Sequence, residues 1–526
     1  MLVDNGVHGD SRVQKAARSA AEAGWDVTLL GRSPNDQPQS WSVGPAEIRL
    51  VPTPARLAKR RREYRRVWLR WPLAYPPSGI AVHRTHAVKA RQADLRTKAA
   101  VFRLGAEAGK PPSLRQRLVL RAQQIAVGVT RRWVSFRSKQ LARARAGRPL
   151  HDIRDRMHTA FWKAVLGDRA WRRLEPGLWD FEFTFGKVID ELKPDLIHAH
   201  DFRMLGVAAR ATIRARAAGR PVKMVWDAHE FVPGLNPPPH RAGWLPAHTG
   251  YEREYAPFAD AVVTVSEDLA DLLQREHKLT ERPAVVLNAP NAVVSAEDLD
   301  PTRSDVRTEC GLDPGTPLLA YCGNVAPVRG VKVMIEALPQ LEGVHVAFVS
   351  LPTGRRAPKY MAELQARAVE LGVADRLHVM PYVPPAQVSR FLATADAAVS
   401  PLHHLPNHEI ALSNKFFEFS QARLPVVVSD VRTMANTVRS IGQGEIFPAE
   451  DLPGYVRAVR AVLADPERYR AAYDRPGLLE SWTWEAQATV LEAVYNRLLP
   501  DCAPRQEPVT GPSDVQREPD RDVATV

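Results

Sequence analysis

The sequence predicts an α/β protein with two doubly wound domains whose strand ends face a common cleft. Three observations carry this prediction. The chain has 526 residues, more than one hydrophobic core usually holds. Short apolar runs alternate with amphipathic stretches of helical period in both halves, which is typical of βαβ units and parallel sheets. Polar residues directly follow several of these runs, at the strand ends where open α/β sheets bind ligands.

The first elements predict one βαβ unit. Residues 1–4 are the stub of a strand, GVHGDSRVQKAARSAAEAG predicts a glycine-containing loop and a helix, and WDVTLLGRS predicts the next strand. Gly6 and Gly9 lie in the loop, where a missing side chain allows close backbone approach to a ligand. The pattern is not a complete dinucleotide-binding fingerprint, so a simple strand-to-helix turn is the alternative. For Asp10 and Arg12, contact with an acceptor or a phosphate and a surface salt bridge are equally good interpretations.

A basic helical insertion is predicted at about residues 56–174, where the alternation stops. Between Arg56 and Leu150 there are 25 Lys and Arg and 3 Asp and Glu, a net charge of +22, whereas the rest of the chain carries −9. One expected helix has Leu57, Tyr64, Trp68 and Trp71 near one face. A longer one, starting near Leu114, has an apolar stripe of Leu118, Ala122, Ile125, Val129, Trp133 and Phe136.

The sequence alone does not decide what the basic insertion binds. Basic amphipathic helices with Trp suit an anionic membrane surface. They suit nucleic acid less well, although such helices do occur there. In the third interpretation the stripes pack within the fold and the charges are merely solvated.

The alternation resumes at residues 193–201 (KPDLIHAHD) and continues through PVKMVWDAHE, ADAVVTVSEDLADLL and RPAVVLNAPN. His198, His200, Asp227, His229 and Glu230 fall at these strand ends. The His-x-His-Asp pattern alone is too little to predict a metal site, and no metal is expected. After a linker, a second series begins with LLAYCGNV. The predicted domains are residues 1–293, 294–475, a helical segment at 476–499 and a disordered tail at 500–526.

Cysteine content and hydropathy limit the location. Cys310, Cys322 and Cys502 are the three cysteines and offer no disulfide framework, so a reducing compartment is expected. No apolar run reaches the roughly 18 residues needed to span a bilayer, and charged residues near Met1 argue against a signal peptide. The expected location is the cytoplasm, either free or peripheral at the inner face of the membrane.

In its motifs, the chain from Met1 to about Leu499, outside the insertion, resembles glycosyltransferase family 4. The matching pieces are DNGVHGDSRVQKAA, PDLIHAHD, WDAHE, VVTVSEDLA, GNVAPVRGVKVMIEAL and NKFFEFSQARLPVVVSD, in this order. The resemblance implies a GT-B fold of two Rossmann-like domains. It implies transfer of a sugar from a nucleotide-diphosphate sugar donor to an acceptor, with retention of configuration and without a cofactor or metal. The acceptor is unknown, and a cell-envelope glycan or a lipid-linked intermediate is expected.

The resemblance also implies donor-binding residues in the C-terminal half. Glu418 would accept hydrogen bonds from the ribose hydroxyls, and the helix N-terminus at Asn414 and Lys415 would face the diphosphate, because free N–H groups there favour anions. A second family glutamate falls on Ile410, so the adjacent Glu409 becomes a candidate contact to the sugar. Arg423 stands where the family commonly has glycine.

Two further basic residues and one histidine complete the implied site. Arg329 and Lys332 resemble the family's basic pair at the diphosphate, where the leaving group gains negative charge; an exposed helix position is the alternative for Lys332. Gly9 is expected to approach the diphosphate with its backbone. His229 stands at the family's active-site histidine near the transferred sugar, and Asp10, Arg12 and Glu230 are acceptor-side candidates.

Three functions compete at this stage. The first is a retaining glycosyltransferase. The second is another GT-B enzyme, such as a sugar-nucleotide epimerase, which binds the same donor and needs no acceptor. The third, from a different class, is a basic adaptor that binds a membrane or nucleic acid on an inactive scaffold.

Overall fold

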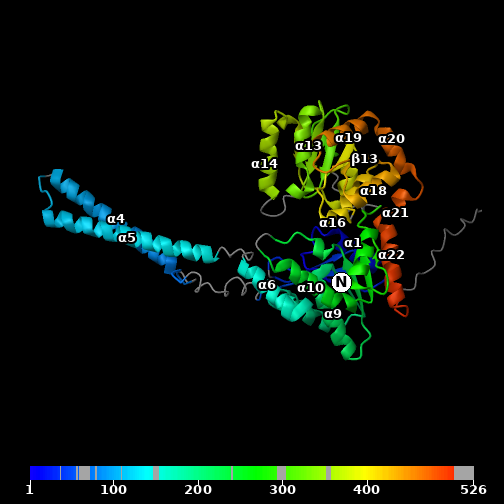
Figure 1. Ribbon diagram of the computed structural model, residues 1–526, viewed down its shortest axis with the longest axis horizontal. Coiled ribbons are helices and arrows are strands. Elements are labelled where there is room, and N and C mark those ends of the chain that lie inside the picture. The colour runs from blue at the N-terminus through cyan, green and yellow to red at the C-terminus, as the bar shows by residue number, and fades with distance from the viewer. Residues whose placement is uncertain are drawn as a thin grey trace, which may run out of the picture. The chain divides into compact units, whose positions relative to one another are not determined.

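A computed structural model of the chain contains two compact units (Figure 1). Unit 1 comprises Met1–Val51, Lys193–Gly234 and Pro257–Val526, and unit 2 comprises Pro52–Leu192 and Leu235–Ala256. The structure describes residues 1–35, 37–54, 57, 72–76, 80–107, 109–145, 153–238, 241–292, 304–350, 357–410 and 412–502. The predicted helix around Trp68, except Leu57, and the predicted disordered tail beyond residue 502 lie outside the described residues.

The first sheet of unit 1 is built around the strand stub at the N-terminus. Leu2 bridges Leu30 and Ala199 in parallel, and so joins the strand order β2-β3-β1 to the order β4-β5-β6-β7. The strands are β1 (Thr28–Arg32), β2 (Gln39–Val43), β3 (Ala46–Val51), β4 (Leu196–His200), β5 (Lys223–Ala228), β6 (Ala261–Thr264) and β7 (Ala284–Val285). The β2–β3 pair is antiparallel, and the other pairs are parallel.

Helices from both ends of the chain cover one face of this sheet. α1 (Ser11–Glu22) buries the small side chains predicted for its stripe, and α22 (Trp484–Leu498) packs beside it in the same apolar cluster. α9 (Asp201–Ala217) and α11 (Glu267–His277) follow β4 and β6. Because α22 packs against the N-terminal sheet, the end of the described chain and its beginning share one core.

The second sheet has six parallel strands in the order β10-β9-β8-β11-β12-β13. They are β8 (Leu318–Cys322), β9 (His345–Val349), β10 (Leu377–Met380), β11 (Ala397–Ser400), β12 (Val426–Ser429) and β13 (Gly444–Phe447). The strand order reverses between β8 and β11, which makes this the topological switch point of the sheet. The strands are almost continuously apolar because helices cover both faces.

One face of the second sheet carries α13 (Lys332–Ala337), α14 (Ala357–Glu370) and α19 (Leu452–Ala464) (Figure 1). The other carries α15 (Val388–Leu392), α17 (Asn414–Gln421) and α18 (Arg432–Ile441). The shorter helices are α12 (Val306–Glu309), α16 (Pro406–Glu409), α20 (Pro466–Arg470) and α21 (Leu478–Ser481). The predicted α/β class with two doubly wound sheets is confirmed. Both sheets belong to unit 1, so the predicted boundary at residues 293 and 294 stays a prediction.

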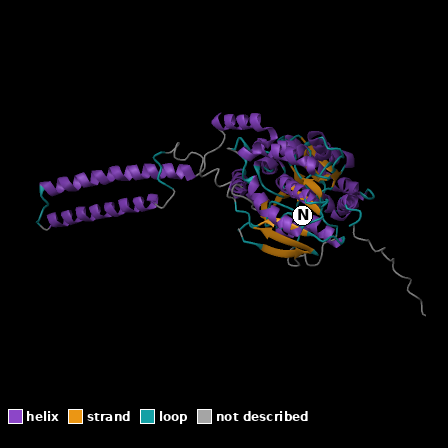
Figure 2. Ribbon diagram, turned by 90° about the horizontal axis from the view of Figure 1, so that it is seen from below, coloured by secondary structure: helices purple, strands orange, loops and turns teal. Residues whose placement is uncertain are grey.

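Unit 2 is helical in its described part. α4 (Ile80–Glu107) and α5 (Leu114–Arg145) lie side by side as a hairpin (Figure 2). They are followed by α6 (Ile153–Leu166), α7 (Trp171–Leu174) and α8 (Leu178–Leu192), and α10 (Trp244–Tyr255) joins them from later in the chain. Trp171 is fully buried, and its ring meets that of Tyr251 edge-on at 4.9 Å. A search of the described helices finds none with the length and apolar character that crossing a membrane requires.

Candidate active site

The switch point of the second sheet opens into a cavity of about 160 Å³. Its wall combines the carboxyl ends of β8 and β11, the turn before α13 and the first turn of α17. The lining residues are Tyr321, Cys322, Gly323, Asn324, Arg329, Val399, Ser400, Leu402, Ser413, Asn414, Lys415 and Phe419. Three of the predicted diphosphate ligands, Arg329, Asn414 and Lys415, therefore meet at one cavity.

Glu418 lies one turn into α17, and its side chain is only 4% exposed. The helix is anchored by Phe416, Phe417 and Phe419, which are buried in the core below it. The ammonium of Lys415 is 2.8 Å from Glu418 Oε2. Burial raises the pKa of the Glu418 carboxyl, and the nearby charge of Lys415 opposes that rise. A buried carboxylate held by one lysine is well placed to accept further hydrogen bonds from a ligand.

A larger cavity, of about 590 Å³, is lined by Glu418 and shares Asn414 with the switch-point cavity. Its lining includes Glu418 and Asn414 from α17, Lys15 from α1, Trp484 from α22, and Tyr382, Pro384 and Pro385 from the loop after β10. The first turn of α17 thus borders both cavities. Residues from the beginning, the middle and the end of the chain meet here, all within unit 1.

Lys15 is a site residue that the sequence analysis did not single out. Its ammonium donates to the backbone oxygen of Ala289, lies 3.2 Å from Asn288 Oδ1 and sits 4.8 Å from the centre of the Trp484 ring. Burial, together with the positive charge of Arg12, lowers the pKa of Lys15 to about 7. A lysine directly beside the predicted apolar stripe of the helix is the signal that would have found it.

Arg329 and Lys332 are separated by the fold. Arg329 ends a short 3-10 turn at Pro327–Arg329 and reaches the switch-point cavity. The next residue, Gly330, has φ +71°, and a Cβ there would lie 1.7 Å from the backbone oxygen of Pro401, so only glycine fits. Lys332 does not line the cavity; its side chain is 61% exposed and 3.6 Å from Glu336.

Glu409 is engaged elsewhere. Its Oε1 is 2.5 Å from Nδ1 of His404, and its Oε2 accepts a hydrogen bond of 2.8 Å from the backbone N–H of Arg432 at the start of α18. The neighbouring Ile410, at the family's glutamate position, is buried. The sugar contact predicted for Glu409 stays a prediction, and in this structure its carboxylate holds the loop and α18 together.

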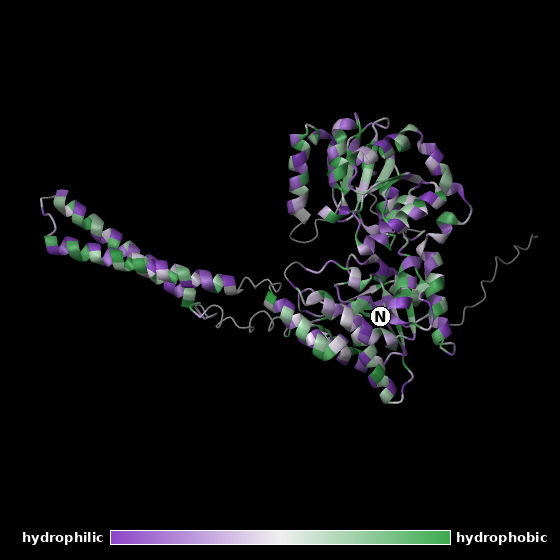
Figure 3. Cartoon of the chain, in the orientation of Figure 1, coloured by the Kyte–Doolittle hydropathy of each residue, from purple (hydrophilic) through white to green (hydrophobic). Residues whose placement is uncertain are grey.

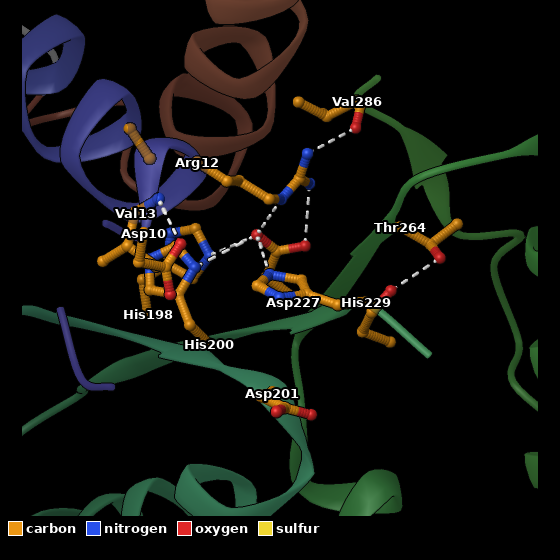
Figure 4. Close-up of polar contacts among 12 residues, drawn as sticks. Asp10, Arg12, Val13, His198, His200, Asp201, Asp227, His229, Thr264 and Val286 are labelled. Atoms are coloured by element: carbon orange, nitrogen blue, oxygen red, sulfur yellow. Dashed lines mark hydrogen bonds and ion pairs between the residues drawn. The ribbon is translucent and has the colours of Figure 1, made fainter. Parts of the chain in front are cut away.

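In the N-terminal half, Asp227 at the end of β5 is the centre of a buried polar cluster (Figure 4). Arg12 donates to both carboxylate oxygens of Asp227, at 2.9 and 2.8 Å, and to the backbone oxygen of Val286 at 2.7 Å. Arg12 is therefore neither an exposed acceptor ligand nor part of a surface salt bridge. Burial disfavours the Asp227 charge, but Arg12 and His229 outweigh it and hold the pKa of the carboxyl well below its ordinary range.

Three histidines surround the same carboxylate. His200 Nδ1 is 3.1 Å and His198 Nε2 3.8 Å from Asp227 Oδ2, and burial lowers the pKa of both rings. His198 also shares a hydrogen bond of 2.6 Å with the hydroxyl of Tyr495 on α22. His198, His200 and Asp227 lie close enough to be considered as metal ligands. The Arg12 guanidinium already occupies both oxygens of Asp227, and its charge would repel a cation.

His229 is the histidine of this cluster that retains exposure. Its Nε2 is 3.0 Å from Asp227 Oδ2, and the ring is 22% exposed. Burial alone would lower its pKa, but the charge of Asp227 raises it above the ordinary value. His229 is therefore held by a buried carboxylate on one side, and part of its ring stays accessible.

The remaining predicted residues are Asp10, Gly9 and Glu230, and Gly9 lines the larger cavity. Asp10 caps α1, since its carboxylate accepts from the backbone N–H of Val13, and it also accepts from Asn5 at 2.7 Å. Gly9 has φ +81° and an open space where a Cβ would be, so its backbone is accessible. Glu230 is exposed. Asp201, the first residue of α9 and directly after β4, is a non-glycine residue with φ +66°, and burial raises its pKa to about 7.

Comparisons with known proteins agree with this architecture. A family model described as Glycosyltransferase Family 4 matches residues 139–291, and one described as Glycosyl transferases group 1 matches residues 316–465. Among curated proteins, D-inositol 3-phosphate glycosyltransferase of Nocardia farcinica is 25% identical over 226 residues, covering 38% of this chain and 48% of that protein. The enzyme of the same name from Thermobispora bispora is 27% identical over 263 residues, covering 47% and 58%. The chain spans about half the length of the curated relatives it matches.

Solved structures show a similar fold over nearly the whole chain. Sucrose-phosphate synthase of Thermosynechococcus elongatus has a TM-score of 0.59 at 16% identity, covering 95% of this chain and 96% of that one. A UDP-forming trehalose-phosphate synthase of Burkholderia xenovorans has a TM-score of 0.55 at 13% identity, covering 95% and 98%. At such identities the likeness establishes the fold.

Proposed function

Because the chain belongs to the glycosyltransferases, with the GT-B fold, we propose that it moves a sugar from a nucleoside-diphosphate donor to an acceptor with retention of configuration. One observation carries the proposal most: Arg329, Lys415 and the start of α17 meet at the switch-point cavity. A leaving diphosphate gains negative charge as the glycosidic bond breaks, and preorganised cations and N–H groups stabilise that charge.

The donor would lie across both cavities. In this arrangement Arg329, Lys415 and Asn414 hold the diphosphate, and the buried carboxylate of Glu418 accepts hydrogen bonds from the ribose hydroxyls. The larger cavity beside Glu418 then takes the nucleoside. Lys332 would have to leave Glu336 to take part, and Glu409 would have to leave His404, so both are secondary candidates. Gly9 offers backbone from the N-terminal half.

His229 is the proposed catalytic residue. Its raised pKa keeps the ring protonated at higher pH than an ordinary histidine, so it can donate a hydrogen bond to a sugar hydroxyl. Asp227 fixes the ring through the contact of 3.0 Å. On the acceptor side Glu230 is the exposed candidate, whereas Asp10 caps a helix and Arg12 is buried. No cofactor or metal is proposed, because the chain supplies its own positive charge at the diphosphate.

The acceptor and the location are part of the proposal. A cell-envelope glycan or a lipid-linked intermediate is the proposed acceptor class, at the cytoplasmic face of a membrane. The support is the charge of the segment between Arg56 and Leu150, +22 against −9 for the remaining chain. Each basic residue near an anionic surface contributes about 1 kcal/mol. Nucleic acid is a weaker alternative, because binding to nucleic acid would not involve the apolar stripes of the helices in this segment.

Turnover with purified protein tests this function. Nucleoside diphosphates are first screened by thermal shift, where a ligand at 100 times its Kd raises the free energy of unfolding by about 2.7 kcal/mol. Release of the diphosphate from the matching nucleotide-sugar is then followed with and without acceptors. A transferase releases it with the acceptor and retains the anomeric configuration, an epimerase isomerises the sugar without any acceptor, and an inactive adaptor does neither.

Two double variants test whether the cations of the switch-point cavity are needed for release of the diphosphate. Arg329→Ala with Lys415→Ala removes the two cations of the switch-point cavity and should abolish release. Arg390→Ala with Lys359→Ala changes two charges of the same half away from the cavity lining and should leave it intact. Unchanged release in the first variant would overturn the site assignment.

A further inference from the structure

α6 exposes a continuous apolar face. Ile153, Met157, Phe161 and Val165 follow each other at intervals of four residues, and their side chains are 75%, 67%, 58% and 57% exposed. On a helix this spacing places all four on one side. Figure 3 shows hydrophobic residues along this helix.

The opposite side of α6 is packed, so the exposed face is not an unformed core. Thr159 is buried there, and the indole N–H of Trp162 donates to His158 at 2.9 Å. The guanidinium of Arg173 lies 5.0 Å from the centre of the Trp162 ring. The helix is thus anchored through one side and open on the other.

The chain that follows α6 fixes it to the folded part of unit 2. The 3-10 turn Gly167–Ala170 begins directly after α6 and packs against α10. A Cβ at Gly250 of α10 would lie 2.5 Å from the backbone oxygen of Asp168, which shows how closely the two backbones approach. A partner that binds the exposed face of α6 would therefore also hold the packed region around Trp171, because the two are connected through this turn.

Exposed apolar residues are concentrated in this unit. Of the 25 large apolar side chains that are exposed in the described ranges, 18 lie between Leu73 and Leu192. A soluble surface exposes single apolar residues at random, whereas a patch of this kind indicates an interaction surface.

The charge around this face selects the kind of partner. Arg156 and Lys163 lie on the side of α6 next to the stripe, and Asp155, its one acidic residue, is half-buried on the packed side. In the same unit α5 contains nine Arg and Lys and no Asp or Glu. A second copy of the chain would bring these positive charges against each other, whereas an anionic surface would neutralise them.

We propose that α6 lies in the plane of an anionic lipid bilayer, with its Ile153–Val165 face in the interface and Arg156 and Lys163 among the headgroups. This rests on the membrane location proposed above and deepens it, since the contact becomes one of apolar insertion as well as charge. Insertion survives high salt, whereas attraction of α5 to headgroups is screened within a Debye length of about 3 Å at 1 M salt.

The experiment is cosedimentation of the full chain with phosphatidylcholine vesicles, with and without phosphatidylglycerol, at low salt and at about 1 M NaCl. The test variant is Met157→Ser with Phe161→Ser. The matched control is Val369→Ser with Val490→Ser, two exposed apolar residues of helices in unit 1. All four side chains are exposed, so the variants should keep the thermal stability of the parent.

The parent is expected to keep part of its binding to anionic vesicles at high salt. The test variant should lose on the order of tenfold of that salt-resistant affinity, keep most of its low-salt binding, and keep its transfer rate toward a soluble acceptor. Salt-resistant binding equal to the parent's would overturn the role of α6 and leave the electrostatic contact standing. Absence of parent binding to anionic vesicles at low salt would remove the membrane location itself. A change of oligomeric state in the test variant, without an effect on vesicles, would show that a second copy covers the face.

Discussion

At the scale of single residues, Glu418 carries the sharpest prediction for binding. In Glu418→Gln the side chain keeps its size and loses its charge, and the hydrogen bonds to the ribose become neutral ones. Nucleoside diphosphate binding should weaken by about 1–1.5 kcal/mol, the difference between a hydrogen bond to a charged group and a neutral hydrogen bond. Isothermal titration calorimetry measures the Kd, with the exposed Glu342→Gln as the control. Equal affinity in both variants would remove the assignment of Glu418.

Lys15 predicts a pH dependence of stability. The folded chain releases the Lys15 proton at about pH 7, whereas the unfolded chain holds it up to its ordinary pKa of 10.5. Above pH 7 the unfolded state therefore binds more protons, and the Lys15 contribution makes the fold more stable as pH rises. Between pH 7 and 8.5 the difference in free energy of unfolding between the parent and Lys15→Met should change by up to about 1.4 kcal/mol per pH unit. Denaturant unfolding at several pH values measures it. The exposed Lys359→Met should show no such slope, and a flat difference for Lys15→Met would contradict the lowered pKa.

The pair of Arg12 and Asp227 predicts a large coupling. Asp227→Asn leaves the buried guanidinium without its counter-charge and should cost about 3–5 kcal/mol of stability. The double variant Arg12→Met with Asp227→Asn should cost clearly less than the sum of the single changes, because no uncompensated charge remains. Urea unfolding of the four proteins measures the coupling. Glu191→Gln, in an exposed pair with Lys187, serves as the reference and should change stability by less than about 1 kcal/mol. Additive single costs would mean that the two side chains do not depend on each other.

The sequence could not reveal the role of Arg12 for a physical reason. Its partner Asp227 lies 215 positions away, and only the packing of α1 against the ends of β5 and β7 brings them together. Asp10, three positions before Val13, shows the opposite case. A helix cap is local, so the sequence contained the signal for it, although the prediction for Asp10 was an acceptor or phosphate contact or a surface salt bridge. The structure also explains why glycine is common at the position of Arg423 in the family. The backbone of Arg423 has φ +55°, a conformation that favours glycine.

At the scale of elements, the loop from β8 to α13 carries a prediction with a built-in control. Gly330 and Gly343 have nearly the same φ, +71° and +70°, but a Cβ would meet the Pro401 oxygen at Gly330 and nothing within 4 Å at Gly343. Both alanine variants should suffer the left-handed penalty of about 1–2 kcal/mol. Gly330→Ala should lose more and should also weaken nucleotide binding, because the turn displaces Arg329. Thermal unfolding and calorimetry measure the two effects. Equal stability and equal affinity in the two variants would show that this turn does not position Arg329.

The elements differ in how far the sequence determines them. The strands of the second sheet were predictable because burial on both faces demands continuous apolar runs, as in VVVS of β12. The sequence predicted where the apolar stripe that starts near Leu118 lies. It did not predict whether another element covers that stripe. A period of 3.6 residues shows that a helix has an apolar side, and whether another element covers that side depends on contacts distant in sequence. The exposed face of α6 escaped prediction for the same reason.

At the scale of the whole molecule, the distribution of charge predicts chemistry without a metal. Two doubly wound sheets place strand ends and helix starts of unit 1 around the donor site, and the proposed diphosphate ligands there are Arg329, Lys415 and the N–H groups of α17. In the proposed site these groups would supply the positive charge that a divalent cation can supply at a transferring phosphate. In the N-terminal half, the oxygens of Asp227 that a cation would need are bonded to Arg12.

Transfer should therefore proceed at an unchanged rate in excess chelator, measured as initial release of nucleoside diphosphate with a protein sample that was dialysed against the chelator beforehand. If the rate falls partly at high chelator concentration, a control at the same ionic strength without chelator shows whether ionic strength is the cause. Complete loss of transfer, restored by Mg²⁺ or Mn²⁺, would show that a cation does what we assign to these side chains. The first place to look for it would then be the donor diphosphate itself, because a phosphate-bound cation needs few protein ligands.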